Sequence, residues 1–551
     1  MTASYDPTAF KAVFERSFTY LAGFRRNTHR FPGRQAMLDP TSGRSWTYAE
    51  LGASVDRMAA GLAAVGVRPG ETVVYQLFNS PEFAMCYLAT QQCAAVGSPI
   101  NFRLAAGETA YILDEAQPRV YAYDVELTDT ARDALGRAHH RPDVVVAADP
   151  AGTGREPLDG AMRFEELLAA GDGRQAPQPE TTIYDETTRL WTSGTTGMPK
   201  PVSLNSAVEV LSAHDVIMHF PLEPGDKTLN MTPWFHRGGL YSGGPNPVFY
   251  VGAAAVPMRA FDAETCLDYV EELGLTYLVG APTSLALLAD AQQARARDLS
   301  TLRGIVTMGA PLDREACLRY QKLLTPNIFN GYGTTEAFWN TFLRPMDLPE
   351  HAGSAGRACT DDDVAVVRVY DDRLAEPHEH VAKDGAEVGE VIVRSPKSGY
   401  SYPGHPEEEA RYFKNGWLYI GDLATWDADE YVTIVGRKDD MIISGGENVH
   451  PVQVEEVLAQ HPDVADAAVV GVPDERWGET VVAYIVTRGD VATASALDEH
   501  CRTNPMLAGF KRPRAYRFVQ ALPMTATGKK MHYKVKQDAV ADAEAGLLER
   551  P

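Results

Sequence analysis

A loop rich in glycine and hydroxyl side chains, closed by one lysine, is the stretch best suited to chemistry. The segment LWTSGTTGMPKPVSLNS covers residues 190–206. Gly194 and Gly197 let the backbone bend tightly and bring its N–H groups close to a ligand. The neighbouring hydroxyl groups add donors, and Lys200 adds a positive charge. The pattern predicts a phosphate-binding loop, and a plain surface loop between two strands is the alternative.

The loop differs from the usual phosphate-binding pattern of NTPases, G-x-x-x-x-G-K-[ST]. Met198 and Pro199 separate Gly197 from the lysine, so this pattern is not met. A different phosphate-binding architecture is therefore expected.

Composition and charge narrow the class of protein. The chain has 551 residues, 44% hydrophobic residues and a net charge of −23, values that suit a globular protein of about three to four lobes. The charge disfavours nucleic acid and anionic membranes as partners. No apolar run reaches the roughly 20 residues of a membrane span, and residues 1–18 lack the apolar core of a secretory signal. The six scattered cysteines favour reduced thiols and a cytoplasmic location.

One segment opposes the acidic trend. Residues 502–536 contain nine lysines and arginines and no aspartate or glutamate. A solvated surface and a site for a polyanionic ligand are both compatible with such a run.

Helix and strand patterns alternate along the chain. Thr47 and Glu50 form a capping box before a helical apolar stripe, and residues 66–78 read as a turn followed by a strand. Residues 261–289 repeat the alternation, which predicts an α/β fold with largely parallel sheets. Residues 417–437 read as two strands joined by an acidic turn, and Pro451 then opens a helix in a new unit. We predict a large domain of layered α/β subdomains over 1–436 and a small, mobile α+β domain over 437–551.

Five motifs in a fixed order identify a family. They are TSGTTGMPK (192–200), NGYGTTEA (330–337), YIGD (419–422), GRKDDMI (436–442) and PMTATGKK (523–530). With them the chain resembles the adenylate-forming superfamily of acyl-CoA synthetases, peptide-synthetase adenylation domains and luciferases, from about Trp46 to Lys536.

The resemblance implies a reaction in which a carboxylate attacks the α-phosphorus of ATP to give acyl-AMP and pyrophosphate. The carboxylate is already ionised near neutral pH, so the enzyme must mainly hold two anions together and neutralise developing charge. The implied catalytic residues are Lys529, Thr335, Glu336 and His236, with Glu336 as a ligand of Mg²⁺. A carboxylate at a helix start is the alternative for Glu336.

The resemblance also implies a nucleotide site. Tyr332 would stack on adenine, and Asp422 would bind the ribose hydroxyls with help from Arg437, although Asp422 could be a turn residue. The implied ATP and AMP residues are Thr192, Ser193, Gly194, Thr195, Thr196, Gly197, Lys200, Gly309, Ala310, Pro311, Tyr332, Gly333, Thr334, Asp422 and Arg437.

Four positions depart from the family pattern. Pro201 replaces a usual glycine after the lysine, and its fixed φ and missing N–H raise the question of altered loop closure. Ile420 replaces a common threonine. Lys530 and His532 replace a common isoleucine and arginine after Lys529.

The last part of the chain resembles aryl-CoA ligases of the chlorobenzoate type in SGGENVHP, DERWGE and GFKRPR. CoA is then the implied acceptor, and Asp439 the implied hinge between an adenylating and a thioester-forming pose. The alternative interpretation of Trp477 is an exposed aromatic residue of a hairpin, without a role in CoA binding. The implied CoA residues are Gly445, Gly446, Trp477, Phe510, Arg512 and Arg514.

The identity of the substrate acid is what the sequence determines least. Glycines around residues 238–244 are expected to leave room for a bulky hydrophobic acid, aromatic or alicyclic. His236 would lie near the substrate carboxylate or gate the CoA tunnel, or be an ordinary partly buried histidine. The expected pocket residues are His236, Gly238, Gly331, Ala337, Phe338 and Trp339.

Two other functions stay open at this point. One is a stand-alone adenylating enzyme that passes acyl-AMP to a carrier protein or a partner ligase. The other is a non-catalytic nucleotide-binding relative, which the presence of Glu336, Asp422 and Lys529 disfavours. The sequence fixes neither the acid, nor the pathway, nor whether the chain acts as a monomer or a homodimer.

Overall fold

The computed structural model describes residues 5–193, 198–370, 373–444, 447–474, 477–489, 492–504, 511–524 and 530–551, together with Leu507 and Gly509. Several predicted site residues lie outside the described residues: Gly194, Thr195, Thr196, Gly197, Gly445, Gly446, Phe510 and Lys529. The side chains of Ser193 and Asp439 also lie outside the description.

The first sheet has seven strands in the order β7-β6-β5-β3-β4-β8-β9, parallel except for the β8–β9 hairpin. Its strands are β3 (Thr72–Gln76), β4 (Val96–Pro99), β5 (Val120–Asp124), β6 (Val144–Ala148), β7 (Met162–Arg163), β8 (Glu186–Ser193) and β9 (Pro199–Asn205). Helices α3 (Tyr48–Ala64), α4 (Pro81–Gln92), α5 (Ala106–Ala116), α6 (Thr128–Arg137) and α7 (Phe164–Ala170) belong to this part. The predicted capping box is confirmed, since Thr47 and Glu50 bond to each other's backbone N–H at the start of α3.

The second sheet has nine strands in the order β16-β15-β14-β13-β12-β10-β11-β1-β2, parallel from β14 to β1 and antiparallel at both ends. Its strands are β1 (Gln35–Asp39), β2 (Arg44–Thr47), β10 (Lys227–Asn230), β11 (Ala254–Ala255), β12 (Tyr277–Gly280), β13 (Gly304–Met308), β14 (Ile328–Thr334), β15 (Phe338–Leu343) and β16 (Arg357–Ala358). Helices α2 (Tyr20–Arg30), α8 (Ser206–His219), α9 (Arg237–Tyr241), α10 (Pro245–Val251), α11 (Ala263–Leu273), α12 (Pro282–Ala294) and α13 (Arg314–Leu323) accompany it. One apolar core joins the two sheets, with Tyr75 of β3 and Val306 of β13 in the same cluster.

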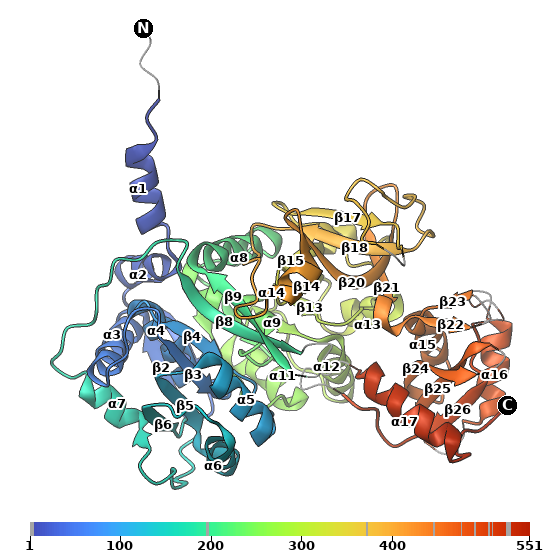
Figure 1. Ribbon diagram of the computed structural model, residues 1–551, viewed down its shortest axis with the longest axis horizontal. Helices are drawn as coiled ribbons and strands as arrows, with labels where there is room; N and C mark the ends of the chain where they lie inside the picture. Colours follow the sequence, from blue (N-terminus) through green and yellow to red (C-terminus); the bar gives the residue numbers. More distant parts are fainter. Residues whose placement is uncertain are drawn as a thin grey trace.

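The third sheet is antiparallel and packs above the second in Figure 1. It contains β17 (Asp363–Val367), β18 (Gly389–Arg394), β19 (Phe413–Lys414), β20 (Trp417–Trp426) and β21 (Val432–Arg437), with α14 (Pro406–Tyr412) beside it. The strand pair β20–β21 confirms the two strands predicted for residues 417–437.

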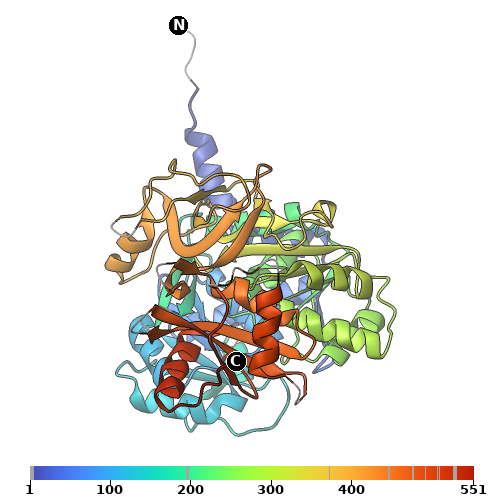
Figure 2. The ribbon, with the colours of Figure 1, turned by 90° about the vertical axis from the view of Figure 1, so that its right-hand side faces the viewer.

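The fourth sheet forms a smaller unit at the right of Figure 1, seen in front in Figure 2. Its strands are β22 (Ile442–Ser444), β23 (Glu447–Val449), β24 (Val464–Asp474), β25 (Gly478–Thr487) and β26 (Ala515–Phe518), and its helices are α15 (Pro451–Ala459), α16 (Ala494–Thr503) and α17 (His532–Glu544). The predicted fold class, a large α/β domain followed by a small α+β domain, is confirmed. The boundary at 436 and the mobility of the small domain stay predictions.

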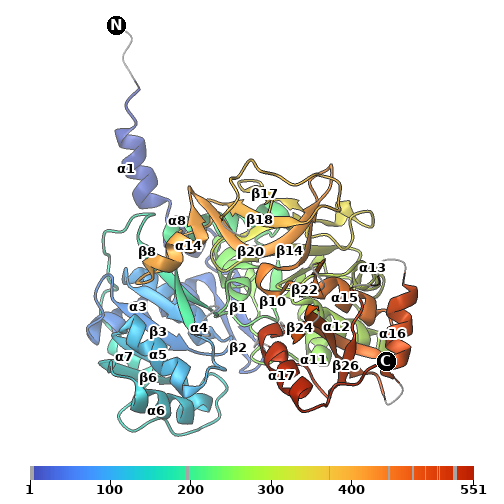
Figure 3. The same cartoon turned by 45° about the vertical axis from the view of Figure 1, so that its right-hand side comes forward.

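The N-terminal helix α1 (Thr8–Ser17) projects from the body of the molecule in Figures 1 and 3. Among the described residues, no helix is both long enough and apolar enough to cross a membrane.

Candidate active site

Two loops predicted to contact adenine leave neighbouring strands of the nine-stranded sheet. Met308, the last residue of β13, pairs with Gly331 of β14. The segment Gly309–Pro311 therefore begins beside the predicted segment Gly331–Thr334. Gly309 has φ +86°, a left-handed conformation that favours glycine. The carboxyl ends of parallel strands in such folds are a common place for ligands.

Three predicted nucleotide residues meet across two sheets. The Tyr332 hydroxyl donates to Asp422 Oδ2 at 2.6 Å, and Arg437 Nη1 donates to Asp422 Oδ1 at 2.6 Å. Asp422 and Arg437 are direct partners in the β20–β21 pair. Burial, and then the charge of Asp422, raise the pKa of the Tyr332 hydroxyl, which keeps it protonated as a donor. This cluster brings the predicted adenine and ribose residues within contact of each other.

Glu336 lies in the turn of the β14–β15 hairpin rather than at a helix start. Thr334 pairs with Phe338, so the turn is Thr335–Ala337. A Cβ atom on Gly333 would lie 1.5 Å from the Phe338 carbonyl oxygen, so the closure requires glycine there. Glu336 is 8% exposed, and its Oε1 accepts a hydrogen bond from the Tyr402 hydroxyl at 2.8 Å. The carboxylate is thus oriented by a side chain from the loop that precedes α14.

The flanks of the predicted phosphate loop form a regular hairpin. Thr192 of β8 pairs with Lys200 of β9. Lys200 is buried, and its Nζ lies 2.6 Å from Glu408 Oε2 of α14. Lys200 is therefore already in an ion pair, so contact with a phosphate would require it to exchange the Glu408 carboxylate for the ligand.

Pro201 lies in β9, outside the loop, and pairs with Trp191. Strand β9 is the edge of the seven-stranded sheet. A proline is tolerated at such an edge because its missing N–H need not serve an inner ladder.

Two of the predicted acyl-pocket glycines lie against neighbouring side chains, and the room that the glycines of residues 238–244 would leave for an acid stays a prediction. A Cβ atom on Gly331 would lie 2.7 Å from Trp339 Nε1, and one on Gly238 would lie 2.9 Å from the Met308 sulfur. Phe338 and Trp339 are buried and stack with ring centroids 4.8 Å apart. Ala337, which precedes them, is fully buried, and the role of these residues as an apolar wall of the acyl pocket stays a prediction.

His236 immediately precedes α9, and its ring packs against that of Phe235 at 4.2 Å. It is partly buried, so both the substrate role and the ordinary partly buried histidine remain open.

Arg237, which the sequence analysis did not single out, is a buried cation beside these residues. Its side chain donates to the Thr335 carbonyl oxygen at 2.8 Å, the Lys397 carbonyl oxygen at 2.8 Å and Ser212 Oγ at 3.1 Å. Only 3% of the residue is exposed. A charge within the apolar segment PWFHRGGLY was the available signal, since such a residue is rarely buried without a specific partner.

In the small domain, much of the basic segment is neutralised within the protein, and the choice between a solvated surface and a site for a polyanionic ligand stays open. Acidic residues from outside the segment pair with five of its nine cations. These pairs are Arg502–Glu499, Arg512–Asp498, Arg517–Asp542, Lys530 with Glu455 and Asp466, and Lys536–Glu479.

The predicted CoA residues that the structure describes differ in their exposure and in their partners. Arg512 Nε lies 2.9 Å from Asp498, whereas Arg514 is exposed and donates to the Gly509 carbonyl oxygen at 3.1 Å. Trp477, at the turn between β24 and β25, is 46% exposed. The exposed Trp477 and Arg514 are available to a ligand from solvent.

The residues that replace the common isoleucine and arginine after Lys529 form a buried ionic cluster. Lys530 Nζ lies 3.1 Å from Glu455 Oε2, and His532 Nε2 lies 2.6 Å from Glu455 Oε1. Burial alone would raise the pKa of Glu455, but Lys530 and His532 lower it to about 2. Both replacements therefore fasten the chain that follows Lys529 to α15.

The residues around Glu336 fit Mg²⁺ in their chemistry. A carboxylate and the hydroxyl of Thr335 offer the hard oxygen ligands that Mg²⁺ prefers.

Comparison with known proteins places both domains in one family. Residues 24–402 match the model of the AMP-binding enzymes, and residues 453–529 match that of the AMP-binding enzyme C-terminal domain. An indoleacetate–CoA ligase from Aromatoleum aromaticum is 33% identical over 92% of this chain and 95% of its own length. A 4-chlorobenzoate–CoA ligase from Arthrobacter sp. is 32% identical over 91% and 92%. The crystal structure of the anthranilate CoA ligase AuaEII in complex with anthranoyl-AMP superposes with a TM-score of 0.85 at 26% identity, over 96% of this chain and 98% of that one.

These matches confirm the predicted resemblance, including its aryl-CoA-ligase branch, and the predicted enzyme class of AMP-forming acid–thiol ligases. The chain belongs to the family of AMP-binding enzymes.

Proposed function

We propose that this protein activates a carboxylic acid with ATP and then transfers the acyl group to the thiol of CoA. The observation that carries this proposal is the meeting of Tyr332, Asp422 and Arg437 beside the hairpin turn that holds Glu336. That arrangement provides hydrogen-bonding groups for a nucleoside next to a carboxylate suited to a metal-bound phosphate.

In the first half-reaction a carboxylate oxygen bonds to the α-phosphorus of ATP, and the bond from that phosphorus to pyrophosphate breaks. Asp422 would exchange its present partners for the ribose hydroxyls, and Lys200 would exchange Glu408 for phosphate oxygens. Lys529 would contact the substrate carboxylate and the α-phosphate. Glu336 would hold Mg²⁺, whose charge would offset that of the phosphates.

In the second half-reaction the CoA sulfur bonds to the acyl carbon, and AMP leaves with the electrons of the broken C–O bond. The exposed Trp477 and Arg514 are suited to the nucleotide end of CoA, because a guanidinium binds phosphate and an indole stacks on adenine. This assignment extends to Arg512 only if its pair with Asp498 opens.

The proposed acid is bulky and hydrophobic, with an aromatic acid preferred. The stacked Phe338 and Trp339 offer an apolar wall, and the relatives named above act on indoleacetate, 4-chlorobenzoate and anthranilate.

The test is a panel of aromatic, alicyclic and fatty acids incubated with ATP and Mg²⁺, with and without CoA. We expect pyrophosphate release with at least one aromatic acid, and acyl-CoA and AMP when CoA is present. Well-adenylated acids that never yield acyl-CoA would favour the alternative, a stand-alone enzyme that serves a carrier protein or partner ligase. Absence of pyrophosphate release with every acid would contradict both.

A variant separates the two half-reactions. Arg514→Ala should raise the CoA KM by about tenfold, as expected for one lost charge-assisted contact, without slowing pyrophosphate release in the first turnover. Arg502→Ala is the matched control, because Arg502 is an exposed arginine of the same segment that pairs with Glu499. Pantetheine, which lacks the nucleotide, should be used equally by all three proteins.

A further inference from the structure

The hairpin turn that carries Glu336 is backed by a buried cation. Arg237 Nη1 donates to the carbonyl oxygen of Thr335, which belongs to the peptide bond that joins Thr335 to Glu336. On the other side of the turn, the guanidinium lies over the Phe338 ring, 5.6 Å from its centroid. Arg237 thus contacts the residue before Glu336 and the residue two positions after it.

The turn itself is conformationally demanding. Phe338 has φ +61°, a left-handed conformation that is strained for a residue other than glycine. The surrounding contacts must therefore hold this geometry in place. The Phe338 ring is held between Arg237 and the stacked Trp339.

Arg237 is also bonded to a residue that is itself held in place, Lys397. Arg237 Nη2 donates to the Lys397 carbonyl oxygen, and Lys397 Nζ lies 2.9 Å from both Asp215 and Asp362. All three of these ionic side chains are buried. The cluster of Asp215, His219 and Cys359 has ligand atoms close enough for a metal ion, but the Lys397 ammonium already supplies the positive charge there.

The same loop that holds Lys397 also carries Tyr402, whose hydroxyl bonds to the Glu336 carboxylate. Glu336 is therefore fixed at its backbone by Arg237 and at its carboxylate by Tyr402. Arg237 and Tyr402 thus both connect Glu336 to the segment 395–402, which leads from β18 to α14.

We propose that Arg237 is a positioning residue that sets the orientation of Glu336 toward Mg²⁺–ATP. The proposal rests on the proposed function, in which Glu336 is the metal ligand. Arg237 acts through the Thr335–Glu336 peptide bond and touches neither the metal nor the reacting atoms. Residues that orient a metal ligand typically affect metal affinity by about 10- to 100-fold.

The test measures Mn²⁺ binding by electron paramagnetic resonance in the presence of a non-hydrolysable ATP analogue. Arg237→Gln should weaken Mn²⁺ binding by about tenfold or more, and Arg237→Lys, which keeps the charge but lacks the forked geometry, should restore it only in part. Arg295→Gln is the matched control, because Arg295 is an exposed arginine in another ionic cluster, and it should bind Mn²⁺ as the parent does. Thermal melts of each protein show whether it is folded.

Folded Arg237 variants with parental Mn²⁺ affinity would overturn the proposal. If Arg237→Gln does not fold, Arg237→Lys decides by the same criterion, and failure of both to fold would make Arg237 purely structural and also overturn it. Pyrophosphate release by the parent protein is measured separately. Its absence would refute the proposed function, while the comparison of Mn²⁺ affinities would still stand.

Discussion

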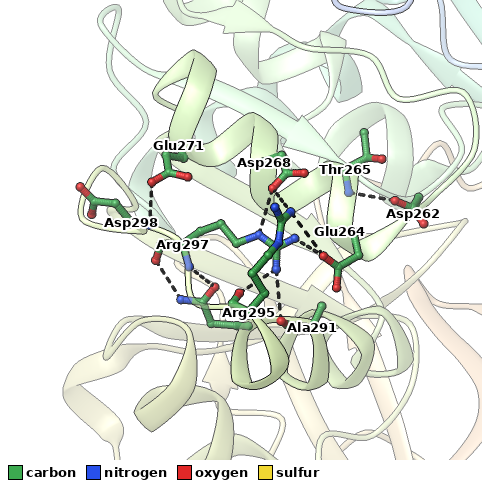
Figure 4. A network of polar contacts seen from close by, with 10 residues as sticks. Asp262, Glu264, Thr265, Asp268, Glu271, Ala291, Arg295, Arg297 and Asp298 are labelled. Atoms are coloured by element: carbon green, nitrogen blue, oxygen red, sulfur yellow. Dashed lines mark hydrogen bonds and ion pairs between the residues drawn. The ribbon is translucent and has the colours of Figure 1, made fainter.

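Two buried arginines in this molecule, Arg297 and Arg237, differ in how their positive charge is compensated. Arg297, shown in Figure 4, contacts the carboxylates of Glu264 and Asp268 from α11 and the carbonyl oxygens of Ala291 and Arg295. Burial alone would lower the pKa of Arg297, but the two carboxylates raise it above its usual value. This cation is neutralised where it lies.

Arg237 has no such neutralisation. Among the described residues, its three hydrogen-bond partners are two carbonyl oxygens and one hydroxyl group. Burial lowers the pKa of Arg237, and the nearby Tyr241, Glu209 and Glu336 offset this effect only in part.

The two arginines also differ in reach. The partners of Arg297 lie within 33 residues of it, whereas those of Arg237 lie 25, 98 and 160 residues away. Arg297 therefore holds one region of the fold together, whereas Arg237 connects segments that are far apart in the sequence and meet beside Glu336. Substitution should separate a loss of stability from a loss of function.

The largest expected effect concerns stability. Arg297→Met removes a buried guanidinium that donates to two carbonyl oxygens and pairs with Glu264 and Asp268, which keep Arg295 as a second cation. Loss of several charge-assisted hydrogen bonds together should cost about 3 kcal/mol. The free energy of unfolding is measured by denaturant titration. Activity per folded molecule should stay within about twofold of the parent, since Arg297 touches no predicted site residue. A stability loss below about 1 kcal/mol would remove the distinction between the two arginines.

The second effect concerns the first half-reaction. Arg237→Gln should slow acid-dependent pyrophosphate release by about 10- to 100-fold, because Glu336 loses its backbone support. Its stability should fall by less than that of Arg297→Met, since Arg237 has no carboxylate hydrogen-bond partner among the described residues and a neutral glutamine avoids the cost of burying an uncompensated cation. If Arg237→Gln lost more unfolding free energy than Arg297→Met, and Arg297→Met slowed pyrophosphate release more than Arg237→Gln, the roles that we assign to the two arginines would be wrong.

A smaller effect is expected at the other support of Glu336. Tyr402→Phe removes the hydroxyl that bonds to the Glu336 carboxylate but keeps the ring. We expect about a tenfold rise in the Mg²⁺ concentration for half-maximal pyrophosphate release, with little change in the Kd for the acid. Tyr400→Phe is the nearby control, since within the described part of the chain the Tyr400 hydroxyl bonds to the backbone of Ser395 and not to Glu336.

The smallest expected effect concerns the ionic cluster of Lys530, His532 and Glu455. Unlike an arginine, a histidine can change its charge near neutral pH. Burial alone would lower the pKa of His532, but Glu455 raises it above its usual value. The stabilisation from His532 is therefore full below its unfolded pKa of about 6.5 and is lost as the pH rises through the higher folded value. The difference in unfolding free energy between the parent and His532→Gln should shrink above about pH 6.5. A difference that grows with pH would show that His532 is not held as the cation.

The sequence predicted what local patterns encode. The capping box at Thr47 and the β20–β21 pair were expected because their signals lie within a few residues. Asp422 and Arg437 were named through motifs, and their direct pairing follows from the short hairpin that joins them.

Contacts between distant segments were not predictable in this way. Lys200 was expected to be available to phosphate, but its partner Glu408 lies on α14. The ion pairs of the basic segment were not predictable either, because its acidic partners come from α15, α16, α17 and the strands of the fourth sheet. Arg237 was missed because no local pattern shows that Thr335 and Lys397 lie on either side of it.

The most direct test of the proposed chemistry is a single turnover carried out in two steps. Enzyme in excess is mixed with a well-used acid, ATP labelled at the α-phosphate and Mg²⁺, and the bound products are identified after quenching; CoA is then added to a parallel sample. The proposed function predicts acyl-AMP and pyrophosphate before CoA is added, followed by conversion of that acyl-AMP into acyl-CoA and AMP. Formation of ADP and phosphate, or acyl-AMP that CoA does not consume, would contradict it.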